Sequence, residues 1–567
     1  MGNKNSSSSG GGSGGANNLS GGNTLSHTSS SNRLTDHMIR ERHANVFKYY
    51  QDVRRLGEGS IGTVRLVKRK KGTEGGSAYD NSTRNGANRG GACACLIDGI
   101  FGCSWLTPRS NNATTATIGN YHSRSNQSES AISDHSELYA LKSIQLRLVQ
   151  KEYLDELRNE ISVLRSLDHP NIVKAYEVYE TKQNIYVVME YCSGGDLYSR
   201  VPYVESQAAN IISQLCSAIG HMHDNGIIHR DIKMENIMFE SSDPTAKIKL
   251  LDFGLSKKYL PGMYMSDWCG TVYTMSPQVI DGVYTNKADC WSIGVIAFLL
   301  LCNEKPFRGK RSEMLSKIKY CDYTFKSPGW SNVSKDAKRF VAALLTKDPT
   351  KRLSAEEALQ HSWLNKKDFE TVSTEQLNER LMANVKDNIL SFAQTSELKR
   401  IAAVIVAHKS SVKEILDMRR AFEKFDKEKD GVITIDEFKA AMAECDEYSD
   451  EDVNAIFEQM DVNKNGKIMY TEFVAATLEL HGRVEEKRLA EAFDHMDDDD
   501  SGFISKENLK KLLGESGTPE RLEKLIGSAD SDGDGRISFE EFLVMFRKDN
   551  IAAVDDEIIT DHVDRRK

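Results

Sequence analysis

Two stretches, His229-Arg230-Asp231-Ile232-Lys233-Met234-Glu235-Asn236 and Asp252-Phe253-Gly254, decide how this chain folds. A glycine-rich turn and a lysine on a predicted strand precede them in the sequence. Any one of these motifs occurs by chance in unrelated proteins. All of them in this order and at this spacing do not assemble by chance. The fold class is therefore set by residues 229–254 and by the motifs on either side.

The glycine-rich turn follows Leu56 and consists of Gly57, Glu58, Gly59, Ser60, Ile61, Gly62, Thr63 and Val64. Because glycine carries no side chain, the backbone can close over the phosphates of a nucleotide. Apolar residues around the turn predict two short strands; they are Val53, Leu56, Val64, Leu66 and Val67. For this turn alone, a plain hairpin without a ligand is the alternative.

Lys142 lies on the next predicted strand, in Tyr139-Ala140-Leu141-Lys142, and Glu160 lies on the helix that follows. A lysine in this place reaches the α- and β-phosphates when a carboxylate holds it. Glu160 is the candidate for that carboxylate. Taken singly, both residues are equally compatible with ordinary surface positions.

Together these motifs resemble the protein kinase family over residues 50–364. The resemblance implies a bilobal kinase fold, ATP and Mg²⁺ as cofactors, and transfer of the γ-phosphate to protein hydroxyls. It implies that Asp231 accepts or orients the hydroxyl proton and that Lys233 neutralises the γ-phosphate. A lysine at this position is the serine/threonine-kinase pattern. Asn236 and Asp252 would hold Mg²⁺.

The same resemblance assigns residues around the nucleotide and the substrate. Met189 is the expected gatekeeper beside the adenine pocket, followed by the hinge residues Glu190 and Cys192. Asp196 and Glu235 match acidic positions that favour a basic residue before the target Ser or Thr. The alternative for Asp196 is a helix cap or a contact with ribose.

The activation segment runs from Asp252 to Gln278 and contains Asp267 and Thr271. Many kinases carry a phosphothreonine where this chain has Asp267, and it pairs with the catalytic-loop arginine, here Arg230. A fixed carboxylate would make that pair without phosphorylation. An exposed loop aspartate with no role is the alternative.

Gln278 is a departure from the family pattern. The segment usually ends in Ala-Pro-Glu, and that glutamate pairs with a buried arginine, here expected to be Arg352. Gln278 can accept a hydrogen bond from Arg352 but offers no charge to pair with it. We therefore expect a less stable large lobe but intact catalysis.

Residues beyond 417 form an acidic repeat with four twelve-residue loops, 426–437, 461–472, 497–508 and 530–541. In the EF-hand pattern, positions 1, 3, 5, 9 and 12 supply side-chain ligands, position 7 supplies a carbonyl and position 6 is glycine. Three loops match; their candidate Ca²⁺ ligands are Asp426, Glu428, Asp430, Val432 and Glu437, then Asp461, Asn463, Asn465, Lys467 and Glu472, then Asp530, Asp532, Asp534, Arg536 and Glu541. An acidic helical domain without metal is the alternative.

The third loop departs from the pattern at its last position. Asp497, Asp499 and Ser501 stand at positions 1, 3 and 5, but position 12 is Asn508, which cannot give a bidentate carboxylate. We therefore expect three competent Ca²⁺ sites and a weak or structural third loop. Each loop carries Ile at position 8, which predicts short strands that pair neighbouring loops; these are Ile433, Ile468, Ile504 and Ile537.

The order of kinase, helical junction and four EF-hands resembles the calcium-dependent protein kinases of plants and protists over residues 46–548. Residues 365–430 contain no Gly or Pro, which predicts a long helical stretch. Its apolar residues stand at helical spacing with basic residues between them; they are Leu381, Val385, Ile389, Phe392, Leu398, Ile401 and Ile405, with Lys386, Lys399, Arg400 and Lys409. The resemblance implies that this junction inhibits the kinase until Ca²⁺ binds. A plain connecting helix is the alternative.

The predicted organisation is α+β and multidomain, with the bilobal kinase followed by an all-α calmodulin-like lobe. The expected parts are a disordered segment 1–45, a kinase domain 46–364 with a disordered insertion at 70–135, a junction 365–416, EF-hands 417–548 and a tail 549–567. A net charge of −9 argues against a nucleic-acid partner. The chain shows no apolar run long enough to span a bilayer and no signal-peptide core. We expect a cytoplasmic monomer with reduced cysteines.

Membrane attachment is predicted from the first residues, Met1-Gly2-Asn3-Lys4-Asn5-Ser6, which fit N-myristoylation at Gly2. One acyl chain holds only weakly and needs a second signal. Cys93, Cys95 and Cys103 are candidates for palmitoylation, or are idle thiols in the insertion. The overall expectation is a cytoplasmic protein that is peripheral on membranes.

Three rival functions remain compatible with parts of the sequence. A pseudokinase scaffold would have lost Lys142, Asp231 or Asp252, and none is lost. A calcium buffer would not need the junction, and a kinase regulated by separate calmodulin would not need its own EF-hands. A calcium-activated serine/threonine kinase accounts for all of these features.

Overall fold

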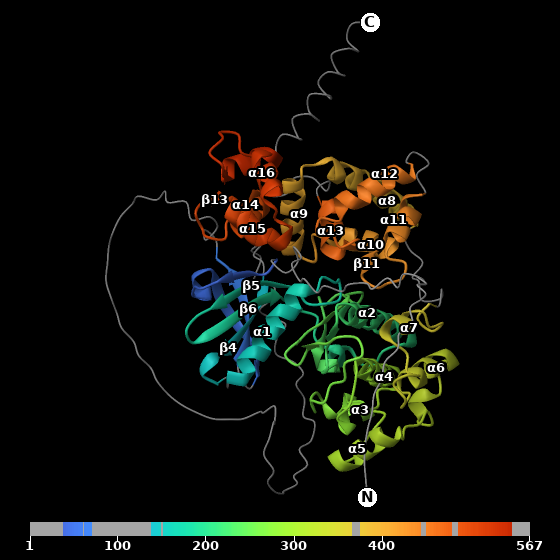
Figure 1. Ribbon diagram of the computed structural model, residues 1–567. Helices are drawn as coiled ribbons and strands as arrows, with labels where there is room; N and C mark the ends of the chain where they lie inside the picture. The colour runs from blue at the N-terminus through green and yellow to red at the C-terminus, as the bar shows by residue number, and fades with distance from the viewer. Residues whose placement is uncertain are drawn as a thin grey trace, which may run out of the picture.

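The structure is a computed structural model that describes residues 38–59, 62–70, 138–148, 151–365, 375–443, 449–478 and 486–546. It comprises a small lobe built on a sheet, a larger helical lobe, and a helical EF-hand lobe that lies against both (Figure 1). The expectations for the first 37 residues, for the insertion and its cysteines, and for the C-terminal tail lie outside the described residues. The expectation that the disordered segment extends to residue 45 was wrong, because Arg40–Arg42 form a strand that pairs with the kinase sheet.

The small lobe is a six-stranded sheet in the order β1-β5-β6-β4-β3-β2. Its strands are β1 (Arg40–Arg42), β2 (Tyr50–Gly59), β3 (Gly62–Arg69), β4 (Leu138–Gln145), β5 (Ala175–Glu180) and β6 (Asn184–Glu190). All neighbours are antiparallel except β1 and β5, which are parallel. Lys68 pairs with Leu138, so the long insertion leaves and rejoins the sheet at one point. Long loops between close ends cost little extra entropy.

Gly62 is required by the close approach of β3 and β4. A Cβ atom at this position would lie 1.8 Å from the carbonyl oxygen of Ser143. Helix α1 (Lys151–Ser166) follows β4 and packs Ile161, Val163 and Leu164 into the core. Strands β2 and β3 are the two strands expected on either side of the glycine-rich turn.

The large lobe is organised around α4 (Lys287–Cys302), which is buried along almost its whole length. A helix that is apolar all round belongs in the centre of a domain. Around it lie α2 (Glu205–Asp224), α3 (Pro277–Asp281), α5 (Arg311–Tyr320), α6 (Lys335–Leu344) and α7 (Ala355–Leu359). Two short hairpin-like pairs carry the catalytic-loop region: β7 (Ile227–Ile228) with β10 (Lys257–Lys258), and β8 (Ile237–Phe239) with β9 (Ile248–Leu250).

The EF-hand lobe contains two pairs of helix–loop–helix units. The helices are α10 (Leu416–Phe425), α11 (Ile435–Met442), α12 (Asp450–Met460), α13 (Tyr470–Leu478), α14 (Glu486–Met496), α15 (Lys506–Leu513), α16 (Pro519–Gly527) and a last one over 539–546. Strand β11 (Val432–Ile433) pairs with β12 (Ile468–Met469), and β13 (Phe503–Ile504) with β14 (Ile537–Ser538). The predicted pairing of neighbouring loops through their isoleucines is confirmed.

The junction is two helices, α8 (Glu375–Gln394) and α9 (Glu397–Lys409), so the expectation of one long helical stretch was wrong. The break between the two helices lies at residues 395–396 and involves neither Gly nor Pro. Ser396 caps α9 instead, because its hydroxyl accepts a hydrogen bond from the Lys399 N–H at 3.3 Å. The Thr395 hydroxyl donates back to the Phe392 carbonyl at 2.7 Å and closes the end of α8.

The apolar face of the junction lies inside the EF-hand lobe. The buried residues are Val385, Ile389, Phe392, Leu398, Ile401 and Ile405, in one cluster with Phe422, Phe473 and Phe542. Helix α8 contacts α10, α12 and α13, whereas α9 contacts α13 and α14. The predicted contact of these apolar residues with the EF-hand lobe is therefore present. The basic residues between them, Lys386, Lys399, Arg400 and Lys409, are buried as well, so the expectation of an amphipathic helix with a basic outer face was wrong for α9. Within the described part of the chain, no helix combines the length and apolarity needed to cross a bilayer.

Candidate active site and calcium-binding loops

Lys142 on β4 and Glu160 on α1 form an ion pair between the sheet and the helix. Lys142 Nζ lies 2.6 Å from Glu160 Oε1 and 3.7 Å from Asp252 Oδ1. Burial lowers the pKa of Lys142, but the two carboxylates outweigh burial and raise it. The lysine is therefore a fixed positive charge that faces the start of the activation segment.

Asp231 is the meeting point of the catalytic loop and the activation segment. Lys233 Nζ lies 2.6 Å from Asp231 Oδ2, and the Thr271 hydroxyl donates to Asp231 Oδ1 at 2.7 Å. The Asn236 amide nitrogen donates to the Asp231 carbonyl at 3.0 Å. Lys233 from the catalytic loop and Thr271 from the activation segment thus contact the Asp231 carboxylate, and Asn236 holds its backbone.

Asp252 has a half-exposed carboxylate that faces Lys142. Its backbone has φ 62°, and its side chain is 52% exposed. Burial raises the pKa of Asp252, but Lys142 and His229 outweigh burial and lower it. Phe253 is 1% exposed and packs on the His229 ring, with centroids 5.3 Å apart. The carboxylate is therefore charged and held by its buried neighbour.

The donor set at this point fits Mg²⁺. Asp252 offers carboxylate oxygens, and Asn236 offers its amide oxygen because the amide nitrogen is already committed to Asp231. Hard oxygen ligands of this kind are what Mg²⁺ prefers. Bound there, the ion would neutralise the charge on the nucleotide phosphates.

Asp289 supports the catalytic loop and was missed at the level of sequence. It is 1% exposed on α4 and accepts hydrogen bonds from the backbone N–H groups of His229 and Arg230, both at 2.9 Å. Arg230 has φ 69°, an uncommon conformation that these bonds help to hold. A single carboxylate in the otherwise apolar run of α4 is the pattern that would have pointed to it.

Asp267 pairs with Arg230, as the sequence predicts. Asp267 Oδ2 lies 2.9 Å from Arg230 Nη1 and 2.9 Å from Lys257 Nζ. The hydrogen bond from Lys257, followed by that from Arg230, lowers the pKa of Asp267. The predicted pair with Arg230 is therefore present, on a loop aspartate whose side chain is half exposed.

Arg352 is 1% exposed and donates to the Gln278 side-chain oxygen at 2.7 Å. Its guanidinium also donates to the carbonyls of Thr346 and Lys287. Burial lowers the pKa of Arg352 to about 10. The predicted hydrogen bond between Arg352 and Gln278 is therefore present.

The residues expected around ATP lie on three strands and the hinge. Leu56, Gly57, Glu58 and Gly59 end β2, Gly62, Thr63 and Val64 begin β3, and Ser60 and Ile61 lie outside the described residues. Met189 and Glu190 end β6, and Cys192 follows as a buried thiol. The Glu190 carboxylate is buried and pairs with Lys249 at 3.0 Å. The hinge can therefore offer a nucleotide its backbone but not this carboxylate.

The two acidic residues expected to bind a basic substrate residue already have partners. Asp196 caps the short helix Leu197–Arg200, because its carboxylate accepts from the Ser199 N–H at 3.0 Å. The cap that was the alternative for Asp196 is therefore present. Glu235 is exposed and accepts from the Tyr273 hydroxyl at 2.8 Å.

The first calcium loop gathers carboxylates without a basic partner inside the loop. Asp426 accepts from the backbone N–H groups of Asp430 and Gly431 at 3.1 and 3.0 Å, and Glu437 accepts from that of Lys427 at 2.9 Å. Burial, Asp430 and Glu437 raise the pKa of Asp426 to about 8. Buried oxygens that repel one another in this way fit a bound cation.

The second loop has the same form and an additional unpaired group. Asp461 accepts from the N–H groups of Asn465 and Gly466 at 3.0 and 2.8 Å. Burial raises the pKa of Glu472 well above its usual range. The Asn463 side-chain oxygen is buried and has no hydrogen-bond partner among the described residues. An unsatisfied oxygen at position 3 fits the ligand role predicted for it.

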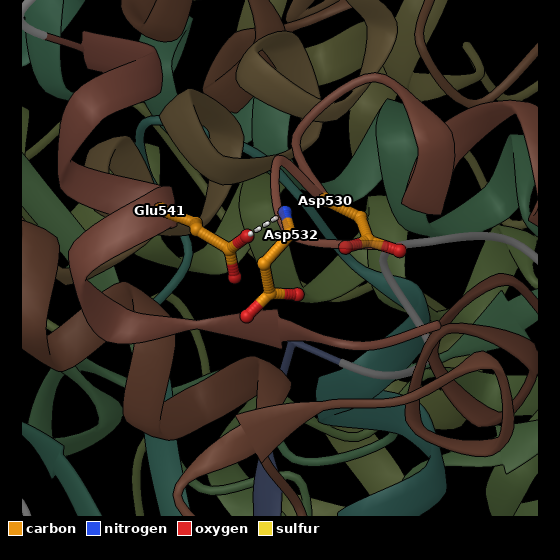
Figure 2. A group of neighbouring side chains, drawn as sticks. All are labelled: Asp530, Asp532 and Glu541. Carbon is orange, nitrogen blue, oxygen red and sulfur yellow. Dashed lines mark hydrogen bonds between the residues drawn. The ribbon is translucent and has the colours of Figure 1, made fainter. Parts of the chain in front are cut away.

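The fourth loop brings three carboxylates together in a more exposed site. Ligand oxygens of Asp530, Asp532 and Glu541 lie within 4.8 Å of one another, and Figure 2 shows these three side chains gathered in the loop. The Asp532 N–H donates to Glu541 Oε1 at 3.4 Å, as the dashed line indicates. The acidic donor set fits Ca²⁺.

The third loop differs from the others because a hydrogen-bond donor stands at position 12. Asn508 donates its side-chain amide to Asp499 Oδ1 at 3.3 Å, whereas the other loops carry a glutamate there. Asp497 accepts from the N–H groups of Ser501 and Gly502 at 3.0 and 2.7 Å. A donor at position 12 takes the place of a metal-binding carboxylate, so the difference expected from sequence has a structural counterpart.

Comparisons with known proteins agree with this arrangement. The protein kinase domain family matches residues 125–364, and the EF-hand domain pair family matches residues 415–478 and 486–547. Calcium-dependent protein kinase 29 of Arabidopsis thaliana is 35% identical over 420 residues, covering 72% of this chain and 77% of that protein. Calcium-dependent protein kinase 2 of Zea mays is 34% identical over 419 residues, covering 72% and 80%.

A protist relative is similar to the same extent. Calcium-dependent protein kinase 5 of Plasmodium falciparum is 33% identical over 417 residues, covering 72% of each chain. The kinase machinery, the EF-hand pairs and these relatives lead to one conclusion. This chain belongs to the calcium-dependent protein kinase family and is a calcium-regulated serine/threonine kinase that uses ATP, Mg²⁺ and Ca²⁺.

Proposed function

We propose that the junction helices restrain the kinase when Ca²⁺ is absent and that the EF-hand lobe removes them when Ca²⁺ binds. One observation carries the proposal: α8 and α9 bury their apolar faces in the EF-hand lobe, while the Asp252 side chain between the lobes is half exposed. In this arrangement the junction helices leave the catalytic residues accessible to a substrate. Without Ca²⁺, the EF-hands would release a basic amphipathic segment suited to an acidic cleft.

In the phosphotransfer step, Asp231 orients the substrate hydroxyl and takes its proton as the oxygen attacks the γ-phosphorus. The bond to the bridging oxygen breaks, and ADP leaves. Lys233 offsets charge on the transferred group, and Lys142, held by Glu160, positions the α- and β-phosphates. Asn236 and Asp252 are the residues proposed to hold Mg²⁺.

The EF-hand lobe contacts the kinase domain on the side of β5 and β8, above both lobes in the view of Figure 1. Arg419 of α10 pairs with Glu240 at 2.7 Å, and both are buried. His408 of α9 makes a 3.1 Å hydrogen bond with the Ala175 carbonyl. A lobe held there by buried polar contacts keeps the junction away from the catalytic residues.

We propose three competent Ca²⁺ sites, in the first, second and fourth loops. Their support is the set of unneutralised carboxylates in these loops and the amide at Asn508 in the third. Substrates are proposed to carry a basic residue before the Ser or Thr, with Glu235 as the exposed carboxylate available to it. N-myristoylation at Gly2, peripheral membrane binding and a monomeric state are further proposals from the sequence.

The decisive experiment measures phosphate transfer to a basic Ser-containing peptide in chelator and in micromolar Ca²⁺. We expect strong stimulation for the wild type, none for Asp231→Asn at any Ca²⁺ level, and a higher Ca²⁺ requirement for Glu437→Gln with Glu472→Gln. Glu451→Gln removes an exposed carboxylate from α12 outside the loops and is the matched control. Equal wild-type activity in chelator and in Ca²⁺ would disprove the regulatory proposal.

A further inference from the structure

Residues 38–42, here named the N-terminal clamp, join the two halves of the molecule. Met38 is buried in the core of the EF-hand lobe, whereas its neighbour Ile39 is buried in the core shared by the kinase lobes. Consecutive side chains therefore belong to two different hydrophobic cores. We propose that the third EF-hand is the binding site for this clamp and holds its arginine guanidinium on the outer face of the loop, beside the ligand positions.

Arg40 makes the central contact of the clamp. Its side chain is 2% exposed; Nη1 lies 2.7 Å from Asp494 Oδ2, and Nη2 lies 2.8 Å from Asp500 Oδ1. Nη2 also donates to the Asp497 carbonyl at 3.0 Å. A planar guanidinium with several donors suits such a set of oxygens, and a buried charge needs it. Asp497 and Asp500 belong to the third loop, and Asp494 to the helix α14 before it.

The clamp is fixed to the kinase domain by its backbone and by the side chain between the arginines. Strand β1 pairs with β5, with Arg40 opposite Glu177 and Arg42 opposite Tyr179. Glu41 pairs with Arg165 of α1. Arg42 Nη2 lies 2.8 Å from Asp494 Oδ2. The odd and even residues of one strand thus face different partners, as the period of a strand dictates.

The third loop is suited to this role because each of its three consecutive aspartates, 498–500, has a hydrogen-bond or ion-pair partner within the protein. Asp498 pairs with Lys511, Asp499 accepts from Asn508, and Asp500 pairs with Arg40. Clustered carboxylates otherwise repel one another and need a cation. The hand therefore keeps its loop form through hydrogen bonds and ion pairs within the chain, and its outer face is free to bind the clamp.

The clamp would favour the arrangement in which the EF-hand lobe lies on the kinase domain. This consequence rests on the proposed function, in which that arrangement is the active one. A contact that exists only in the active arrangement shifts the equilibrium towards it and lowers the Ca²⁺ concentration needed for activation. Removing the Arg40 contacts should raise the half-activating Ca²⁺ concentration by about tenfold or more, the order expected for the loss of a hydrogen bond between charged groups.

The test uses full-length Arg40→Ala and Asp500→Asn. Asp500 is more than half exposed, so its substitution removes the pair without disturbing a core. Glu41→Gln is the matched control, because Glu41 lies in the same strand but contacts only Arg165 on the kinase side. Two quantities are measured: the half-activating Ca²⁺ concentration, and hydrogen exchange of residues 38–46 and 489–500 in Ca²⁺.

We expect faster exchange in both segments and a higher Ca²⁺ requirement for Arg40→Ala and Asp500→Asn, with Glu41→Gln close to wild type. Exchange and activation unchanged in both variants would overturn the clamp. Faster exchange with an unchanged Ca²⁺ requirement would overturn its regulatory role. A wild type that ignores Ca²⁺ would refute the proposed function instead, and the exchange data would still decide whether Arg40 holds the third EF-hand.

Discussion

The Asp168 carboxylate accepts two hydrogen bonds from Thr471, one from its backbone N–H at 2.9 Å and one from its hydroxyl at 2.6 Å. Both residues are buried. Thr471 directly precedes Glu472, a predicted Ca²⁺ ligand at the start of α13, and Asp168 lies just after α1, which carries Glu160. A carboxylate of the kinase domain thus satisfies the N-terminus of an EF-hand helix.

This contact predicts that Thr471→Val weakens calcium activation although Thr471 touches neither ATP nor Ca²⁺. The variant removes one hydrogen bond to a charged group, a loss of about 1.5–3 kcal/mol. We expect the half-activating Ca²⁺ concentration to rise about tenfold or more. Thr477→Val is the control, because its hydroxyl bonds only within α13. Identical Ca²⁺ curves for both variants would show that the contact is not part of the switch.

The Arg230–Asp267 pair predicts a kinase that needs no activation-loop phosphate. Phosphatase treatment should leave the calcium-stimulated kcat unchanged, whereas Asp267→Asn should lower it about three- to tenfold, because Arg230 and Lys257 lose their carboxylate. Asp281→Asn, which breaks an exposed pair with Lys319, is the control. A phosphatase-sensitive wild type would contradict this expectation.

Local sequence patterns predicted which residues come together in the catalytic loop and in the EF-hand loops. Asp231, Lys233 and Asn236 stand within one short loop, and glycines mark each EF-hand turn, so spacing alone places these groups. Gly431, for example, has φ 83°, as position 6 of a tight loop requires. Where function depends on a short stretch with a fixed backbone, the sequence carries the geometry.

Contacts between distant segments were not predictable in the same way. Thr471 with Asp168, and Arg419 with Glu240, each join an EF-hand helix to the kinase domain, and no periodicity marks any of these residues. The break between α8 and α9 also escaped prediction, because serine and threonine end helices through side-chain hydrogen bonds that helix propensity does not reveal. The contacts of Arg40 with the third EF-hand were likewise not predictable, because they depend on how the EF-hand lobe packs on the kinase domain and not on the loop pattern.

Asn508→Glu should restore a calcium site in the third loop. The substitution supplies the missing bidentate carboxylate at position 12 and removes the amide that now donates to Asp499. Calorimetric titration should give three Ca²⁺ ions for the wild type and four for the variant. Asn508→Gln, which keeps the amide, is the control and should remain at three. Four tight sites in the wild type would contradict the assignment of this loop.

Lys174→Met should stabilise the interface between the kinase domain and the EF-hand lobe. Lys174 Nζ is buried over the Tyr470 ring, and no described residue accepts a hydrogen bond from it. Burial lowers the pKa of Lys174 from 10.5 to about 8. At pH 7 the cost of charging it in the folded state is about 3 kcal/mol, so its removal should raise the unfolding midpoint by several degrees.

The pH dependence gives a second check on Lys174. Between pH 8 and 10.5 the unfolded chain holds more protons at this lysine than the folded chain, so stability at this site rises with pH. The advantage of Lys174→Met over wild type should therefore be largest below pH 8 and shrink towards pH 10. Lys182→Met, at an exposed position between β5 and β6, should show no such difference. A constant advantage across this range would disprove the explanation.

Gln278→Glu should stabilise the large lobe modestly without changing the chemistry. The carboxylate would turn the hydrogen bond from the Arg352 guanidinium to an amide oxygen into an ion pair, a gain of about 2 kcal/mol. It would also lose the bond that the Gln278 amide donates to the Lys347 carbonyl at 2.7 Å, which offsets about 1 kcal/mol. The net gain of about 1 kcal/mol predicts an unfolding midpoint higher by about 2–4 °C, with kcat unchanged. Gln183→Glu adds the same charge at an exposed site and should have no effect. A lower unfolding midpoint for Gln278→Glu would mean that the lost contact with the Lys347 carbonyl outweighs the ion pair with Arg352.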